Sequence, residues 1–197
     1  MQFLSEGRAV YVAADGRVDA DHRWDPRQPT AILPGAFDPV HAGHWGLADA
    51  AAQTLGMNVA FELSIVNADK PPLAPAEIER RQAQFGGRAG VWLTSAPRFV
   101  EKAELFPGAV FVVGADTALR VVDPRYYDGD TNRMHAALAR LRDRANRFLV
   151  ACRIDVAGRC IGLEDVPVPP AFRDLFGVIP ADVFRLDLSS TQLRLAK

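Results

Sequence analysis

The sequence predicts an α/β fold, in which a doubly wound, parallel β-sheet carries helices on both faces and a small β-hairpin precedes it. Short apolar runs that suit buried strands alternate with longer segments of helical periodicity, and this alternation is typical of βαβ units. The chain has 197 residues, enough for one domain with small additions. Hydrophobic residues make up 49% and charged residues 24%, as in ordinary globular proteins, so a sizeable core is expected.

Residues 1–29 are predicted to form an N-terminal hairpin and a linker, separate from a main domain over residues 30–197. The stretch AVYVAADGRVD (9–19) has two β-prone runs around an Asp-Gly pair, which is favoured in tight hairpin turns. The stretch DHRWDPRQP (21–29) is polar and interrupted by prolines, which is typical of a linker.

The main pattern begins with the apolar run TAILP, a short strand predicted to end at Pro34. The loop GAFDPVHAGH (35–44) follows, and a helix over 44–56 carries apolar residues on one face. The further predicted strands cover 58–68, 91–95, 109–116, 147–155, 159–166 and 182–187, and the further helices cover 76–86, 97–106, 131–147 and 189–196. Ligands bind beyond the carboxyl ends of the strands in such sheets, so the loops expected to bind them are 35–44, 67–75, 114–130 and 187–191.

Composition and charge exclude several classes of protein. A net charge of −1 makes nucleic acid as a bulk partner unexpected, whereas a small anionic ligand in a local basic site stays open. No apolar run approaches the roughly 20 residues of a membrane helix, and the N-terminus lacks the apolar stretch of a signal peptide. We therefore expect a cytoplasmic protein that does not contact membranes, with a homo-oligomer left open. Cys152 and Cys160 lack the spacing of a zinc site and are expected to be reduced thiols.

His41 and His44 are the residues of the loop 35–44 best suited to chemistry. Gly35 directly follows the preceding strand and lets the backbone approach a ligand, and the following helix begins with free N–H groups that suit anions. Three interpretations of the histidines are open: zinc ligands, buried core residues, or groups that bind phosphate. No third zinc ligand stands at a convincing spacing, and a glycine-rich polar loop favours phosphate. Asp38, before a proline, is expected to order the loop by favouring a turn.

Two motifs resemble those of a known family. GAFDPVHAGH resembles the HxGH signature of the nucleotidylyltransferase superfamily, which is cytidylyltransferase-like, and it matches without a gap the form G-x-F-D-P-x-H-x-G-H. That form is typical of the nicotinate or nicotinamide mononucleotide adenylyltransferase branch. LSSTQLR (188–194) resembles the family's second signature, I-S-S-T-x-I-R, with Leu for Ile at two places. The resemblance spans roughly residues 30–197 and implies a Rossmann-like sheet.

The resemblance assigns roles to the first loop. His41 and His44 would contact the triphosphate and stabilise the transition state at the α-phosphorus. Gly35, with the backbone amides near Ala36 and Phe37, would hold phosphate. Neutral imidazole donates a hydrogen bond and imidazolium adds charge, and both suit phosphate oxygens.

The resemblance also assigns roles to later residues. Ser190 and Thr191 would cap the last helix and bind the β- and γ-phosphates, and Arg194 would add a cation one turn later. Lys70 would lie near the acceptor phosphate, although a solvated lysine is the alternative. Asp116, in the segment GAD, would face adenosine or the acceptor base; its alternative role is the N-cap of a helix that begins at the next residue.

The implied reaction is attack by an acceptor phosphate on the α-phosphorus of a nucleoside triphosphate, with pyrophosphate as the leaving group. An acceptor phosphate is already ionised near neutral pH, so no general base is needed. Mg²⁺ is expected to arrive with the triphosphate, and no other metal is expected. ATP with a pyridine mononucleotide is the leading pair of substrates. The alternatives are a cytidylyltransferase, another acceptor in the superfamily, or a nucleotide-binding protein without turnover.

Overall fold

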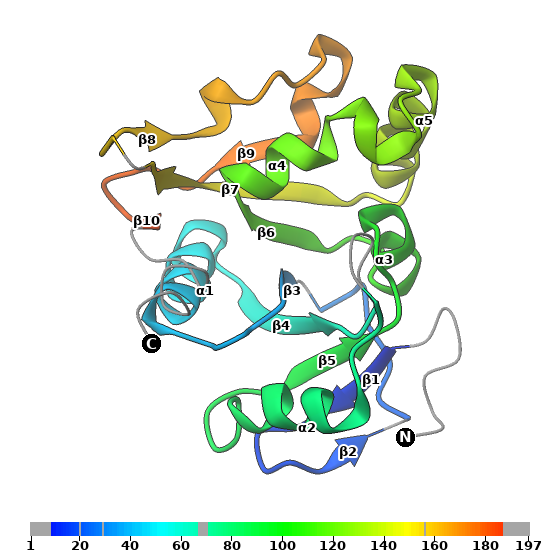
Figure 1. Cartoon of the computed structure of the whole chain (residues 1–197), viewed down its shortest axis with the longest axis vertical. Coiled ribbons are helices and arrows are strands. Elements are labelled where there is room, and N and C mark those ends of the chain that lie inside the picture. Colours follow the sequence, from blue (N-terminus) through cyan, green and yellow to red (C-terminus); the bar gives the residue numbers. More distant parts are fainter. Residues whose placement is uncertain (1–8, 20, 29, 67–70, 156, 187–197) are drawn as a thin grey trace.

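A mostly parallel β-sheet forms the centre of the protein, as the sequence predicts (Figure 1). The computed structural model describes residues 9–19, 21–28, 30–66, 71–155 and 157–186. The strands are β1 (Ala9–Val12), β2 (Val18–Asp19), β3 (Thr30–Gly35), β4 (Asn58–Ser64), β5 (Val91–Thr94), β6 (Val110–Gly114), β7 (Arg147–Ile154), β8 (Cys160–Ile161), β9 (Phe176–Val178) and β10 (Arg185–Leu186). Their order across the sheet is β10-β7-β6-β3-β4-β5-β1-β2, with β8 and β9 also paired to β7.

Helices cover both faces of the sheet, which confirms the doubly wound arrangement (Figure 1). The helices are α1 (Ala42–Leu55), α2 (Pro75–Ala83), α3 (Phe99–Leu105), α4 (Ala115–Val121) and α5 (Thr131–Asp143), with 3₁₀ turns η1 (Pro124–Tyr127), η2 (Leu163–Asp165) and η3 (Pro170–Leu175). On one face α1 and α2 bury Leu47 and Ile78 against strand residues such as Leu33. On the other face α3, α4 and α5 form a second cluster, in which Leu138 packs with Phe111. Each helix thus buries one apolar side on the sheet, as its sequence period requires.

The N-terminal hairpin extends the sheet. β1 pairs with β2 in the predicted hairpin, and Gly16 takes the positive φ of 84° that the turn between them requires. β1 also pairs antiparallel with the whole of β5, from Ala9 opposite Thr94 to Val12 opposite Val91. The hairpin is confirmed, whereas the domain boundary at residue 29 stays a prediction.

Several elements differ from the sequence-based expectation. The segment 114–130, expected to be a loop, begins with α4, and β9 occupies a stretch with no predicted element. The predicted strand over 58–68 ends already at Ser64. The predicted helix over 189–196 lies outside the described residues. α4 and β9 are short, so neither shows enough periods of its pattern to stand out in the sequence.

Cys152 and Cys160 form a disulfide, so the expectation of two reduced thiols is wrong. The antiparallel pairing of β7 with β8 places their Cα atoms 5.7 Å apart, within the range that a disulfide spans. The sequence predicts that the strands 147–155 and 159–166 pair around Ala157-Gly158, but the expectation of reduced thiols rested on cysteine usage inside cells and not on this pairing, which brings the two cysteines together.

A charged pair lies inside the core on the α3 face. Glu62 of β4 is 0% exposed and Lys102 of α3 is 4% exposed. The Lys102 Nζ donates to Oε1 of Glu62 at 2.7 Å and to the Ser64 hydroxyl at 3.1 Å. The Thr94 hydroxyl donates to the same Oε1, whereas Glu62 Oε2 is buried with no hydrogen-bond partner among the residues that the structure describes. The pair therefore links β4, β5 and α3 through polar contacts that water does not reach.

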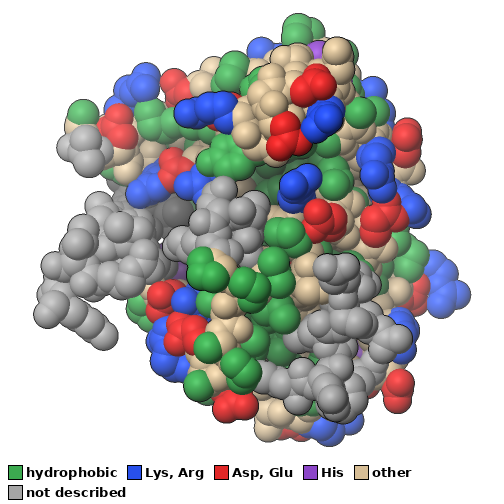
Figure 2. Space-filling model, turned by 45° about the vertical axis from the view of Figure 1, so that its right-hand side comes forward, with side chains coloured by type: hydrophobic (Ala, Val, Ile, Leu, Met, Phe, Trp, Pro, Cys, Tyr) green, Lys and Arg blue, Asp and Glu red, His purple; other side chains and the backbone are tan. Residues whose placement is uncertain are grey.

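The surface mixes charges of both signs. On the face that Figure 2 shows, acidic and basic side chains lie next to one another and do not gather by sign. Glu104 of α3 pairs with Arg140 and Arg144, and Arg142 of α5 pairs with Asp174. None of the helices in the described ranges has the length and apolar character that a membrane crossing needs.

Candidate functional site

The loop 35–44 lies where the order of the strands reverses. From β3 the chain adds β4 and β5 on one side, and it then crosses to add β6 and β7 on the other. β3 and β6 are parallel neighbours, so Gly35 and Gly114 end their strands at the same edge. Ligands of doubly wound sheets bind in the crevice outside the carboxyl ends at such a point. The structure therefore places the predicted loop where this fold binds ligands.

His41 and His44 lie against each other at the start of α1. Their ring centroids are 3.8 Å apart, and His41 is the N-cap residue of the helix. The backbone N–H of His41 donates to Nδ1 of His44 at 3.2 Å. Because Nδ1 accepts, the proton of a neutral His44 ring is on Nε2, which makes that nitrogen a hydrogen-bond donor.

Burial keeps both imidazoles neutral near pH 7. Desolvation lowers the pKa of His41, and desolvation followed by the nearby charge of His41 lowers the pKa of His44 from 6.5 to about 4. Both ring nitrogens of His41 are buried and lack a hydrogen-bond partner within the described part of the chain. Buried polar nitrogens usually have a partner, so these atoms are suited to a ligand that supplies one.

Phe37 is a core residue, and its side chain anchors the loop 35–44 in the hydrophobic core. Its side chain is 1% exposed, and its ring meets the rings of His44, Phe61 and Phe85 edge-on at 5.0–5.7 Å. A Cβ at Gly35 would lie 2.7 Å from this ring, so the close approach at that glycine is made by Phe37. Only the backbone of Phe37 can therefore serve the phosphate-binding role that the sequence assigns to it, and that role stays a prediction.

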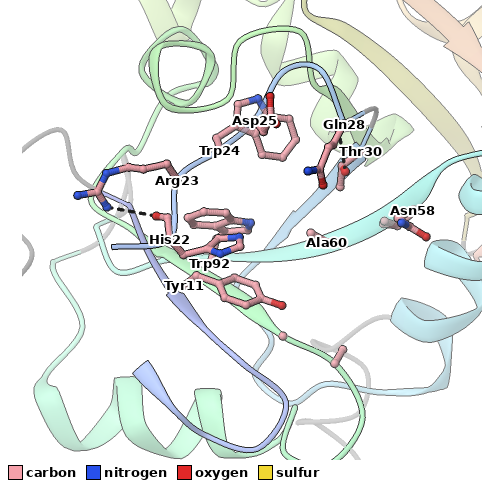
Figure 3. A pocket seen from close by; sticks show the side chains of 13 residues that line it. Tyr11, His22, Arg23, Trp24, Asp25, Gln28, Thr30, Asn58, Ala60 and Trp92 are labelled. Atoms are coloured by element: carbon pink, nitrogen blue, oxygen red, sulfur yellow. Dashed lines mark hydrogen bonds between the residues drawn. The ribbon is translucent and has the colours of Figure 1, made fainter. Parts of the chain in front are cut away.

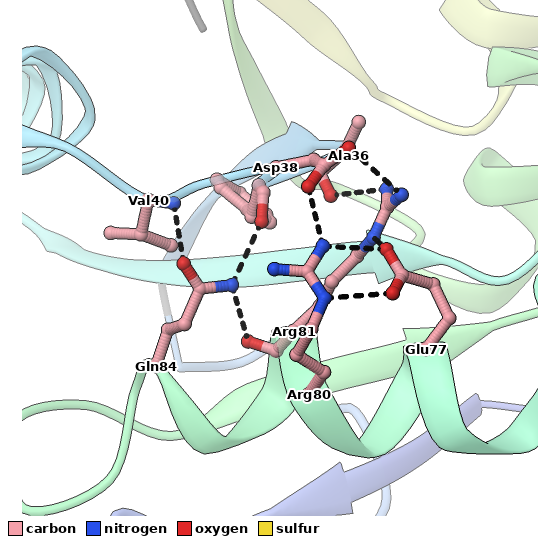
Figure 4. Close-up of polar contacts among 8 residues, drawn as sticks. Ala36, Asp38, Val40, Glu77, Arg80, Arg81 and Gln84 are labelled. Carbon is pink, nitrogen blue, oxygen red and sulfur yellow. Dashed lines mark hydrogen bonds and ion pairs between the residues drawn. The ribbon is translucent and has the colours of Figure 1, made fainter. Parts of the chain in front are cut away.

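Asp38 is held by two arginines of α2 (Figure 4). Arg80 donates to one carboxylate oxygen and Arg81 to the other, the latter at 3.2 Å. Glu77 accepts from both arginines at 2.6–2.7 Å, and these hydrogen bonds lower the pKa of Glu77 to about 2. Asp38 thus orders the loop, as its sequence context indicates, and its carboxylate is already engaged.

The side chains of Arg81 in α2 and of Gln84, the C-cap residue of α2, also bind the backbone of the loop. Arg81 donates from Nη1 to the carbonyl of Ala36 at 2.8 Å. Gln84 donates from Nε2 to the carbonyl of Phe37 at 3.0 Å and accepts the backbone N–H of Val40 at 2.9 Å (Figure 4). We use the name α2 clamp for four side chains of α2 and its C-cap: Arg80, Arg81 and Gln84, which bind the loop, and Glu77, which binds the two arginines.

The sequence reasoning missed the α2 clamp. Its members are spaced by three or four residues, so they lie on one face of the helix. The signal available in the sequence was a stripe of polar residues that can donate and accept hydrogen bonds. It lies on the helix that is predicted to follow the acceptor loop. The contacts join residues 42 to 47 positions apart, and no local pattern reports such pairing.

Asp116 lies in the first turn of α4 and forms an ion pair with Arg153 of β7. α4 begins at Ala115 with Gly114 as its N-cap residue, so the alternative role of Asp116 as an N-cap is wrong. Its carboxylate lies at the same edge of the sheet as the histidines, because α4 follows β6 directly. Contact of Asp116 with a base or an acceptor stays a prediction.

Four predicted site residues, Lys70, Ser190, Thr191 and Arg194, lie outside the described residues. The described residues on either side of 67–70 lie close together, since the backbone N–H of Leu73 donates to the carbonyl of Ile65 at 2.9 Å. For the zinc interpretation, the described ranges contain no group of three or more His, Cys, Asp or Glu side chains that could hold a metal.

A hollow of about 430 Å³ lies at the other end of the sheet (Figure 3). Thr30 and Asn58, the first residues of β3 and β4, line it, so it opens at the amino ends of the strands. Tyr11, His22 and Trp92 form its aromatic wall, with ring centroids 4.5–5.2 Å from one another. These rings pack mainly on one another, and the hollow is separate from the loop 35–44.

A family comparison agrees with the geometry. The sequence model of the cytidylyltransferase-like family matches residues 32–196, a range that includes the loop 35–44 and the segment 188–194. No curated protein is similar enough to count as a match. The match covers most of the chain, and the matched loop lies at the ligand-binding edge of a doubly wound sheet. The chain therefore belongs to the cytidylyltransferase-like family, within the HxGH nucleotidylyltransferase superfamily, and this membership indicates nucleotidyl transfer as its class of reaction.

Proposed function

We propose that the protein is an adenylyltransferase that joins ATP to the phosphate of nicotinate or nicotinamide mononucleotide and releases pyrophosphate. The observation that carries the proposal is the pair of neutral histidines at the start of α1, at the reversal point of the sheet. The choice of substrates is supported by the gapless match of GAFDPVHAGH to the form that is typical of this branch.

His41 and His44 are proposed to act as hydrogen-bond donors to the α-phosphate. The tautomer of His44 presents Nε2–H, since its Nδ1 accepts the His41 backbone N–H. The buried nitrogens of His41 lack a partner in the described part of the protein, and a phosphate oxygen would supply one. Donors fixed in advance stabilise the charge that builds up on the phosphorus oxygens in the transition state.

The reaction needs no group that removes a proton. An oxygen of the acceptor phosphate, ionised near pH 7, forms a bond to the α-phosphorus, and the bond from that phosphorus to the bridging oxygen of the β-phosphate breaks. The electron pair leaves with pyrophosphate. The residues of the site therefore contribute by positioning the two phosphates in line and by stabilising charge.

Mg²⁺ is proposed to enter with the triphosphate. The donor set of the loop consists of imidazole and amide groups, which fit phosphate oxygens, whereas Mg²⁺ prefers oxygen ligands. The nearby carboxylates of Asp38 and Asp116 are paired with arginines. When bound, the ion would neutralise charge on the triphosphate, while Ser190, Thr191, Arg194 and Lys70 are proposed to hold the β- and γ-phosphates and the acceptor.

The test is pyrophosphate release with Mg²⁺, in which ATP and CTP are each combined with both pyridine mononucleotides, phosphopantetheine and glycerol 3-phosphate. We expect ATP with a pyridine mononucleotide to be the active pair. His44→Ala should lower kcat by about 10²–10³, because one donor to the transition state is lost. His22→Ala is the matched control, since His22 lies in the hollow at the other end of the sheet, and it should keep full activity.

Each other outcome of this test has a definite meaning. A CTP-dependent pair would correct the nucleotide, and a different acceptor would correct the branch. Nucleotide binding without pyrophosphate release for any pair would indicate a binding protein without turnover. A fully active His44→Ala variant would refute the role of the histidines.

A further inference from the structure

Each hydrogen bond from the α2 clamp to the loop fixes the direction of one peptide group. Arg81 holds the carbonyl of the peptide that joins Ala36 to Phe37, and Gln84 holds the carbonyl of the peptide that joins Phe37 to Asp38. Both peptides are trans. In a planar trans peptide the N–H points away from the C=O, so the amides of Phe37 and Asp38 point away from α2.

Gln84 fixes both ends of the turn before the histidines. Its amide donates to Phe37 and accepts from Val40, the residue before the N-cap His41. One planar side chain thus bridges two backbone groups three residues apart. A change in its position would move the carbonyl of Phe37 and the start of α1 together, and the two histidines are carried by that first turn.

The charges of the α2 clamp are balanced when Asp38 of the loop is included. Arg80 and Arg81 each donate hydrogen bonds to both Glu77 and Asp38. The phosphate-facing side of the loop therefore receives oriented N–H groups from this arrangement and little net charge. The α2 clamp therefore contributes by orienting backbone amides, and its effect should depend on which side chain binds which carbonyl.

We propose that Arg81 and Gln84 are positioning residues of the site: Arg81 directs the amide of Phe37, and Gln84 directs the amide of Asp38, toward the phosphates of the nucleotide. The proposal rests on the phosphate-binding role of the loop, and it adds a separate residue on α2 for each amide. Neither side chain contacts the substrate in this scheme. Both act through the backbone of residues 36–40.

The test follows the amide signals of Phe37 and Asp38 by ¹H–¹⁵N NMR while inorganic tripolyphosphate is added. Both amide protons should shift downfield in the wild-type protein. Gln84→Ala should lose the response of Asp38 and keep that of Phe37, and Arg81→Met should do the reverse. Each variant should bind tripolyphosphate roughly tenfold more weakly or worse, as expected when one bond to a charged group is lost.

Two control variants test whether the effects come from the orientation of the loop amides, and not from the loss of a charge or from a change in helix stability. Arg80→Met removes the same charge as Arg81→Met, but Arg80 binds no loop carbonyl among its described contacts, so the Phe37 response should persist. Gln53→Ala removes an exposed glutamine from α1 and should leave both amide responses unchanged. Simultaneous loss of both responses in each of Gln84→Ala and Arg81→Met would show general loosening of the loop and overturn the proposal.

Turnover provides an independent measurement. With ATP, nicotinate mononucleotide and Mg²⁺, Gln84→Ala should lower kcat by about 10- to 100-fold, while the KM of the acceptor stays within twofold. A wild-type protein with no turnover but with both amide responses would refute the proposed reaction and leave the positioning role supported. Tripolyphosphate that binds without shifting either amide would overturn the positioning role. Absence of tripolyphosphate binding would overturn both.

Discussion

Acidification should destabilise the protein through His44. The pKa of this imidazole is about 4 in the folded protein and 6.5 in its ordinary environment, because folding buries the ring beside His41. Between these values the unfolded chain binds a proton that the folded site excludes, so stability is intact above pH 6.5 and falls as the pH drops toward 4. The two pKa values differ by about 2.5, and one pKa unit corresponds to about 1.4 kcal/mol. The loss attributable to His44 is therefore about 3 kcal/mol, or a decrease in Tm of roughly 6–12 °C for a chain of this size.

The measurement compares urea unfolding of the wild type and of His44→Asn between pH 4 and pH 7.5. Asparagine cannot titrate, and its carbonyl can still accept the backbone N–H of His41. Groups that titrate in this range away from these two rings are common to both proteins and cancel in the difference. We expect the wild type to lose about 3 kcal/mol more than the variant by pH 4. Stability curves that stay parallel over the whole range would refute the reasoning, because they would mean that folding does not change the pKa of His44.

Three further outcomes are expected. Lys102→Met should lower the free energy of unfolding, measured in urea, by about 3–5 kcal/mol, because Glu62 keeps a buried charge without its partner. A second substitution in the same protein, Glu62→Gln, should recover most of this loss. A loss below about 1 kcal/mol in Lys102→Met alone would contradict this account. Reduction of the Cys152–Cys160 disulfide, which spans a sequence separation of 8, should lower the free energy of unfolding by up to about 2.5 kcal/mol. Before this test, the intact mass measured without reductant should be that of the thiol form less two hydrogens, which shows that the disulfide is present. Gly35→Ala should cost about 1–3 kcal/mol, because its methyl would overlap a phenylalanine ring at 2.7 Å, and an unchanged Tm would show that the ring moves freely.

The loop 35–44 could be predicted because its signals are local. A buried strand that ends in glycine, a turn with Asp38 and Pro39, and a helix that starts near His44 all occur in one short stretch of sequence. Such signals depend on the conformational preferences of neighbouring residues, and the structure confirms the arrangement. The alternation of strands and helices predicted the fold class for the same reason.

Two features that escaped prediction depend on contacts between distant residues. Gln84 meets Phe37 only because α2 packs on the same face of the sheet as α1. Lys102 and Glu62 are 40 positions apart, and a lysine on an amphipathic helix is ordinarily solvated. In both cases periodicity predicts the element and leaves open which element lies beside it. The Cys152–Cys160 disulfide is a different case, because the cysteines are only 8 positions apart and their strands are predicted to pair; the contact follows from the register of β7 and β8.

The pairing of β1 with β5 covers one edge of the sheet. All four residues of β5 pair with β1, so a chain that began at residue 30 would present the unpaired backbone of Val91–Thr94 at the sheet edge. Such an edge is a template for strands of other molecules, and a protein shortened in this way should self-associate at concentrations at which the whole chain does not. Among the strands that the structure describes, the outermost at this edge is β2, which has two residues and ends in Asp19. Because β2 covers only Tyr11 and Val12 of β1, the hairpin replaces the continuous four-residue edge of β5 with two shorter pieces, and it thereby limits pairing with a second molecule.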